Sequence, residues 1–229
     1  MATKKRHGFT LTELLVVIAI IAMLAALVSV GVMSAMARAK ATRIKVELDQ
    51  IDSAMRAYKD KYGAYPPSDL RQPMTNAALR QHIAMAFPRY DLTQLPNEIV
   101  AAGVDVDNFR PDQALYFFLR GFSPDPTHPF VSPKGEPIRA GAAVPGEKVA
   151  LVPLMEFDQT RLGAVDKNGA DLPITDAMPS YFPPSSPVGT TGAPYVYWDS
   201  RSYGETPPPT TADPTRPKRF FNADNSTAK

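Results

Sequence analysis

The hydrophobic pattern of the chain opens with a long uncharged segment. From Leu14 to Ala37 no residue carries a charge, and Leu, Ile, Val and Ala occupy every face of a helix built on these positions. As a helix, these 24 residues are roughly 36 Å long, and a bilayer core of about 30 Å needs about 20. The pattern predicts a membrane-spanning helix. A helix buried in a protein core is the weaker alternative, because such a helix usually shows one apolar stripe.

An amphipathic segment continues this helix. Its apolar residues recur in alternating steps of four and three, which places them on one helical face: Ala37, Ala41, Ile44, Leu48, Ile51, Met55, Tyr58 and Tyr62. Gly63 is a common helix stop, and Pro66-Pro67 prevents continuation. The pattern predicts one helix over residues 9–62, about 80 Å long. We expect the stripe to pack on the following domain; a coiled-coil dimer is the alternative.

Proline separates this helix from the rest of the chain. None of the 24 prolines precedes Pro66, so a turn-rich domain with short elements should follow. The patterns indicate a helix within 111–122, capped by Asp112 and stopped by Gly121, and a second helix over about 76–86. Strands are expected within 147–157 and 193–204, and Asn168-Gly169 indicates a hairpin turn. We therefore expect an α+β fold, with a small antiparallel sheet on the second half of the long helix.

Charge orients the segment. Lys4, Lys5 and Arg6 precede it, and Lys and Arg flanks stay cytoplasmic, so the large domain should lie outside. Beyond this cluster the charges nearly balance, which argues against a nucleic-acid partner. A cleaved secretory signal ending at Ala35 to Ala37 is an alternative, but the apolar run is too long and the helical pattern continues through the supposed cut. The chain has no cysteine, which excludes disulfides and thiol chemistry.

Glu13 is an acidic residue near the start of the apolar run. A charged residue at the centre of a membrane helix costs about 2.5–3.5 kcal/mol, and less near the end. If the chain were cut between Gly8 and Phe9, a free amine would appear four residues from Glu13 and could pair with it, within one chain or between chains. A glutamate that snorkels to the headgroup level is the alternative.

The rest of the chain shows few signs of chemistry. Asp166, Asn168 and Asp171 offer oxygen ligands suited to calcium, but the glycine comes too early for an EF-hand loop and no glutamate closes it, so a turn is favoured. His82 and His128 have no metal-ligand partner at short spacing. No hydrolase, phosphate-binding or zinc-protease motif occurs, so we predict neither catalysis nor a required cofactor.

The N-terminal residues "KKRHGFTLTELLVVIAIIAML" resemble the leader and first helix of type IV pilins and type II secretion pseudopilins. Gly8, Phe9 and Glu13 fall on the family's processing and assembly positions. The segment "ATRIKVELDQIDSAMRAYKDKYGAYPPS" is similar to the continuation in major pseudopilins. Two features depart from the family: Val30 stands where many members have proline, and no counterpart of the pseudopilin calcium loop is evident.

The resemblance implies a pilin-like fold and a structural role. A prepilin peptidase would cut after Gly8 and methylate Phe9, and the new amine would neutralise Glu13 of a neighbour during assembly. Partners would be copies of the chain, other pseudopilins, the inner-membrane assembly platform and the lipid bilayer. The localisation would be the inner membrane in a single pass, followed by the filament. A membrane-anchored exported binding domain without a filament role is the competing interpretation.

These inferences divide the chain into five parts, listed by residue number. They are a basic leader (1–8), a transmembrane assembly helix (9–37), its amphipathic continuation (38–63), a globular α+β domain (64–205) and a flexible tail (206–229).

Overall fold

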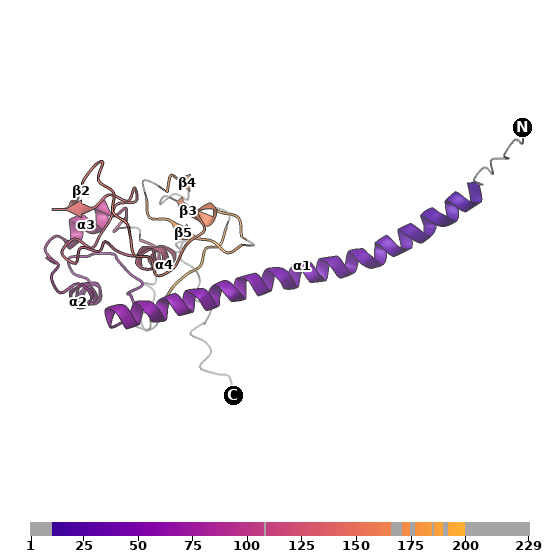
Figure 1. Ribbon diagram of the computed structural model, residues 1–229. Coiled ribbons are helices and arrows are strands. Elements are labelled where there is room, and N and C mark those ends of the chain that lie inside the picture. The colour runs from indigo at the N-terminus through magenta and orange to yellow at the C-terminus, as the bar shows by residue number, and fades with distance from the viewer. Residues whose placement is uncertain are drawn as a thin grey trace, which may run out of the picture. The chain divides into compact units, whose positions relative to one another are not determined.

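The computed structural model describes residues 11–107, 109–165, 171–174, 177–184, 186–189 and 192–199, without the side chains of residues 27–31 and 165. The chain divides into two compact units, Met1–Glu47 and Leu48–Lys229. Helix α1, Leu11–Tyr62, begins in the first unit and ends in the second (Figure 1). The tail predicted over residues 206–229 lies outside the described residues.

Helix α1 confirms the prediction of one long helix, of 52 residues, over the positions described. It contains no proline and only one glycine, Gly31, so nothing in its sequence forces an end before Tyr62. It passes through position 30, where the expected family proline is absent. Gly63 then adopts a φ of 84°, and its N–H donates to the Lys59 carbonyl at 2.7 Å. This left-handed residue is what ends the helix.

The apolar stripe of α1 is buried only near its C-terminal end. Met55, Tyr58 and Tyr62 are buried, Ile44 and Ile51 are half-buried, and Ala37, Ala41 and Leu48 are exposed. The buried residues pack within the second unit against side chains of other helices: the Tyr58 ring lies 5.7 Å from the rings of both His82 and Phe118. The periodic pattern therefore identified the correct face, but the face is longer than the part that packs.

Three short helices follow α1. They are α2, Ala77–Ala86; α3, Leu95–Ala101; and α4, Pro111–Leu119. Helix α2 confirms the expected second helix, and Asn76 caps it by accepting a hydrogen bond from the Leu79 N–H at 3.0 Å. Helix α3 was not predicted from the sequence, because its seven residues are too short to establish a period.

The N-terminal cap of α4 corrects the sequence prediction. Arg110, not Asp112, is the N-cap residue, and its backbone N–H is held by the Gln113 side chain at 3.1 Å. Asp112 lies one residue inside the helix, where its buried carboxylate pairs with Arg110 at 2.5 Å and accepts from the Ser180 hydroxyl at 2.7 Å. The aspartate was displaced from the cap because Pro111 takes the first helical position. Gly121 follows the helix with a φ of 90°, as expected of a stop.

Two small antiparallel sheets complete the fold and confirm the α+β class. One pairs β1, Ile138–Arg139, with β2, Ala142–Ala143. The other has the order β4-β3-β5, formed by Asp171–Leu172, Leu162–Val165 and Ser180–Tyr181, and a short 3-10 helix, Gln159–Arg161, precedes β3. Strand β5 packs on α4, and β1 and β2 pack on α3. We expected the sheet on α1, and the structure instead covers the buried end of α1 with side chains of α2 and α4.

Two predicted strands are absent from the described residues. Within 147–157 only an isolated bridge forms, between Phe122 and Val152. Over 193–199 no strand is assigned, although Val196 and Trp198 are exposed while their neighbours are at least half-buried, as the alternation predicted. The Tyr195 N–H donates to the Tyr181 carbonyl at 2.8 Å, so the segment follows β5 without extending the sheet. The predicted Asn168-Gly169 turn lies outside the described residues, between the paired strands β3 and β4.

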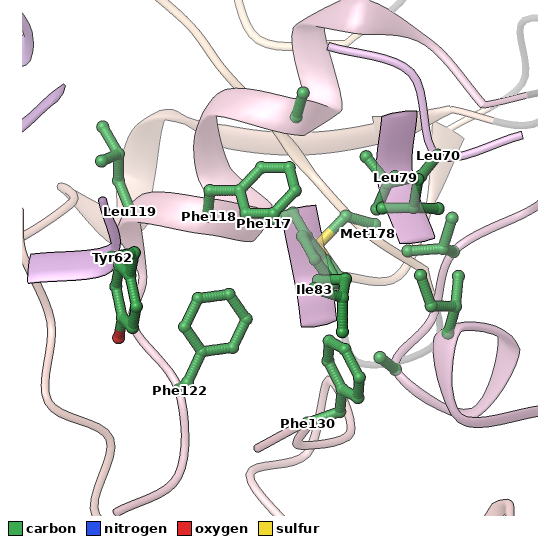
Figure 2. Packing of buried hydrophobic residues seen from close by; sticks show 14 of the residues in the cluster. Tyr62, Leu70, Leu79, Ile83, Phe117, Phe118, Leu119, Phe122, Phe130 and Met178 are labelled. Carbon is green, nitrogen blue, oxygen red and sulfur yellow. The ribbon is translucent and has the colours of Figure 1, made fainter. Parts of the chain in front are cut away.

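The core of the second unit is rich in aromatic rings. Figure 2 shows Phe117, Phe118 and Leu119 of α4 beside Tyr62, with Phe122 and Phe130 close by. The rings of Phe117 and Phe118 meet edge to face at 4.9 Å, and Tyr62 meets Phe122 in the same way at 5.8 Å. Edge-to-face pairs add about 0.5–1.5 kcal/mol beyond the area they bury. The core therefore fixes the last turns of α1 to the globular unit.

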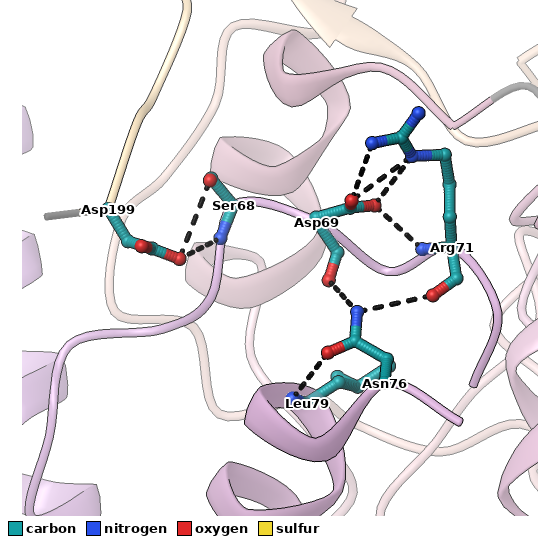
Figure 3. A network of polar contacts seen from close by, with 6 residues as sticks. All are labelled: Ser68, Asp69, Arg71, Asn76, Leu79 and Asp199. Carbon is teal, nitrogen blue, oxygen red and sulfur yellow. Dashed lines mark hydrogen bonds and ion pairs between the residues drawn. The ribbon is translucent and has the colours of Figure 1, made fainter. Parts of the chain in front are cut away.

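A polar network ties distant segments of this unit together (Figure 3). The buried carboxylate of Asp199 accepts from the Ser68 N–H at 2.9 Å, although the two residues are 131 positions apart. The Tyr197 hydroxyl donates to the Pro66 carbonyl at 2.9 Å. The Asn76 amide donates to the carbonyl of Asp69 at 3.2 Å. The bonds of Asp199 and Tyr197 hold the segment that follows α1 against the segment 193–199, and the Asn76 bond stabilises the approach to α2.

Candidate functional site

The N-terminal half of α1 exposes apolar side chains on all of its faces. Leu14 to Ile18 are five consecutive exposed apolar residues, and five neighbours in a helix cover its whole circumference. The other large exposed apolar residues of this half are Leu11, Ile20, Ile21, Met23, Leu24, Val32, Met33 and Met36. Soluble monomers rarely expose apolar surface on this scale, so these residues indicate an interaction with lipid or with other helices.

Glu13 lies in the first turn of this helix and is exposed. A carboxylate there interacts favourably with the helix dipole, because the unsatisfied N–H groups give the N-terminus a partial positive charge. The residues that follow it, from Leu14 through Ala37, carry no charge. The arrangement can therefore present one negative charge at the end of an apolar rod, and a cation that meets it there is bound in surroundings that water enters poorly.

The other residues predicted for processing lie outside the described part of the chain. These are the leader cations Lys4, Lys5 and Arg6, with Gly8 and Phe9. Of the five N-terminal site positions and Glu13, the structure thus places only Glu13.

No helical stretch among the residues whose side chains are described is both long enough and apolar enough to cross a membrane.

The structure does not assemble a metal site from its described residues. Asp171 is exposed in β4, and Asp166 and Asn168 lie outside the described part. In the described ranges, no group of three or more His, Asp or Glu side chains is arranged to hold a metal ion.

Both histidines of the globular unit take part in local contacts. His82 is buried, and its Nε2 lies 2.8 Å from the Tyr58 hydroxyl. His128 lies 3.2 Å from Asp125 through Nδ1. Asp125 also accepts from the Thr127 hydroxyl at 2.6 Å and from its N–H at 2.9 Å, and these bonds lower the pKa of Asp125 to about 2. These contacts give His82, His128 and Asp125 a structural role within the globular unit.

Sequence reasoning missed the buried acids of the globular unit. Asp199 is buried against Ser68, and Asp112 is buried against Ser180. Glu98 is also buried, and burial raises the pKa of its carboxyl group. No local signal identifies such residues, because their partners come from segments far away in the chain.

Comparisons with known proteins address the N-terminal region. Residues 3–29 match the family model described as the prokaryotic N-terminal methylation motif. The chain is 42% identical over 66 residues to the type II secretion system core protein G of Pseudomonas aeruginosa. The aligned region covers 29% of this chain and 46% of that protein. The chain thus spans about half the length of this curated relative. No solved structure matches the chain.

The matched residues contain the features that the structure and sequence single out: the basic cluster, Glu13 and the first part of the apolar helix. This chain therefore carries a match to the prokaryotic N-terminal methylation motif, and in its N-terminal region it is similar to a type II secretion core protein G.

Proposed function

We propose that the chain is a structural subunit of a type II secretion pseudopilus or of a filament like a type IV pilus. In this proposal a prepilin peptidase removes residues 1–8 and methylates Phe9. The apolar half of α1 holds the subunit in the inner membrane and then forms the filament core. The globular unit lies on the exported side. The chain performs no chemistry on a substrate; it is itself the substrate of the processing enzyme.

The observation that carries this proposal is the place of Glu13, in the first turn of a helix whose apolar residues are exposed on all faces and within the methylation motif. An inert anchor gains nothing from a carboxylate there. A charged residue costs about 2.5–3.5 kcal/mol at the centre of a membrane helix, and an opposite charge offsets much of such a cost. The amine created at Phe9 supplies that charge, in the same subunit or in its neighbour.

Assembly follows from the geometry of such a contact. A contact in which the amine of one copy meets the carboxylate of the next is heterologous, and heterologous contacts that do not close produce helical filaments. The exposed apolar faces of α1 then become buried between subunits. The similarity to core protein G supports a secretion pseudopilus as the kind of filament.

The first test is the covalent state of the N-terminus. Protein purified from membranes of its host should begin at methyl-Phe9 in N-terminal sequencing and intact mass measurement. A chain that begins at Arg38 would be a released exported protein, and a functional chain that keeps residues 1–8 would also refute the proposal.

The second test is substitution of Glu13. Glu13→Gln keeps the shape of the side chain and removes its charge, so filaments seen by electron microscopy should be lost while the protein remains in the membrane. Asp49→Asn is the matched control, because Asp49 is an exposed acid of the same helix and its replacement changes the charge equally. If Glu13→Gln assembles as well as the control, the chain is an anchored domain without a filament role.

A further inference from the structure

Four basic residues follow the uncharged run of α1 and are called the basic band here: Arg38, Lys40, Arg43 and Lys45. All four are exposed. From Leu14 to Val46 the chain has no acidic residue, and the first acids after the band are Glu47, which is buried, and Asp49, which is exposed. Within the described residues none of the four takes part in an ion pair. The charges are therefore available to an external anion.

The basic band surrounds the helix instead of lining one side. Arg38 and Lys45 are seven residues apart, about two turns, and so share one side of α1. Lys40 and Arg43 lie on the opposite side, because each residue turns the helix by about 100°. A second helix contacts only one side of α1. A layer of lipid headgroups around an inserted helix contacts all of its sides. The four cations of the band, which lie on opposite sides of α1, therefore suit a headgroup layer better than a second helix.

The position of the band along the helix fits the same partner. The 24 uncharged residues before it are roughly 36 Å long, enough for a bilayer core of about 30 Å with some tilt. The band then covers roughly 10 Å of the helix, and each headgroup layer is about 5–8 Å thick. Long Lys and Arg side chains reach along the helix to the interface, so all four cations can meet that layer.

The charge balance of the chain makes the band unusual for a passive anchor. Lys and Arg are normally concentrated on the cytoplasmic side of a membrane segment. In the proposed orientation the band lies on the exported side, and cleavage after Gly8 removes the three cations on the other side. A segment that keeps four cations on the disfavoured side needs a favourable contact there.

We propose that the basic band binds the phosphate groups of anionic lipids in the leaflet that faces the exported side. The inference rests on the membrane-inserted orientation given in the proposed function. Each cation near an anionic surface contributes about 1 kcal/mol, a preference of about fivefold for an anionic over a zwitterionic lipid. Because the band lies just beyond the apolar run, it holds the subunit at a fixed depth until the subunit leaves the membrane for the filament.

The test uses the full-length chain reconstituted in phosphatidylcholine vesicles. Spin-labelled phosphatidylglycerol or spin-labelled phosphatidylcholine is added in trace amounts, and electron paramagnetic resonance measures the fraction of each lipid immobilised by the protein. The wild type should favour phosphatidylglycerol about fivefold, and the preference should weaken at high salt. Replacing all four residues of the band by Gln should reduce the ratio to about one.

A matched variant removes four exposed cations of the second unit, two of them from the last turn of α1: Lys59, Lys61, Arg89 and Lys148, each replaced by Gln. It changes the net charge equally and should keep the lipid preference. Glu13→Gln should also keep it, because lipid binding does not require assembly. Inorganic phosphate should displace the labelled lipid no better than chloride at equal ionic strength; stronger displacement would mean that the band takes free phosphate.

The outcomes separate this inference from the proposed function. A wild-type chain that enters vesicles without preferring phosphatidylglycerol overturns the inference alone, as does an equal loss in the matched variant. If the band variant keeps the lipid preference but no longer forms filaments, the band binds acidic residues of a second copy instead. A chain that does not insert at all overturns both the inference and the membrane-spanning part of the proposed function.

Discussion

Tyr58 provides the sharpest test of how α1 is fixed to the globular unit. Its side chain is fully buried, and its hydroxyl lies 2.8 Å from Nε2 of His82. Burial raises the pKa of Tyr58 well above its usual range, so the hydroxyl stays protonated and can donate to the imidazole. The ring also packs against Tyr62 at 4.6 Å and Phe118 at 5.7 Å.

The substitution Tyr58→Phe removes one oxygen and keeps these ring contacts. A neutral hydrogen bond contributes about 0.5–1.5 kcal/mol, and a buried polar group that loses its partner costs about 1–3 kcal/mol. We therefore expect the free energy of unfolding to fall by about 1–3 kcal/mol. Tyr58→Ala also removes the ring and should cost about 3–5 kcal/mol, as large-to-small substitutions of buried aromatic residues do.

Urea unfolding of the full-length chain in detergent micelles measures both changes. The fluorescence of Trp198, the only tryptophan of the chain, reports on the globular unit because its neighbour Asp199 is bonded to Ser68. Tyr65→Phe is the control, since Tyr65 is 42% exposed, and it should change stability by less than about 0.5 kcal/mol. If Tyr58→Phe is as mild as this control, the bond to His82 does not stabilise the unit.

Two further predictions follow from local geometry. Gly121→Ala should lower the free energy of unfolding by at least about 2 kcal/mol in the same assay, because φ is 90° and the new Cβ would lie 2.2 Å from the Val152 carbonyl oxygen. Gly146→Ala is the control: its φ is 83° but the space around it is open, so it should cost only about 1–2 kcal/mol. Equal costs for the two variants would show that the clash at Gly121 relaxes. Asp125 has a pKa lowered to about 2 by Thr127, so its contribution to stability is present above pH 4 and is lost as the pH falls toward 2. Thr127→Val should raise this pKa in an NMR titration of the carboxyl carbon, and an unchanged value would contradict the assignment.

The two parts of α1 differ in how far the sequence could predict them. The long helix, its end at Gly63 and the buried face that includes Tyr58 could be predicted from the sequence. The apolar residues recur about every 3.6 positions, and this spacing is visible within a short stretch of the chain. The same pattern did not show where packing starts. Leu48 continues the stripe but is 48% exposed, since burial depends on what lies opposite and not on the helix itself.

The candidate site was accessible from the sequence for a similar reason. Glu13, the basic cluster and the uncharged run are adjacent in the chain, and their order is what the methylation-motif match reflects. The four cations of the basic band are also close together in the chain, and no acidic residue lies between Leu14 and Val46. The arrangement of its cations around α1 follows from helical geometry once the helix continues through residues 38–45, and the structure confirms that it does.

The globular unit shows what the sequence left open. Its strands have two to four residues, too few for an alternating pattern, so β1, β2 and β5 were missed. The strands expected within 147–157 and 193–204 do not form over the residues of these ranges that the structure describes. The bond of Asp199 to Ser68, and of Asp112 to Ser180, joins groups that no local pattern relates. The sequence by itself determined the helix, its uncharged segment and the match to the methylation motif, because these depend on neighbouring residues. Only the tertiary structure decided which acids are buried and where α1 packs, because burial requires partners from distant segments.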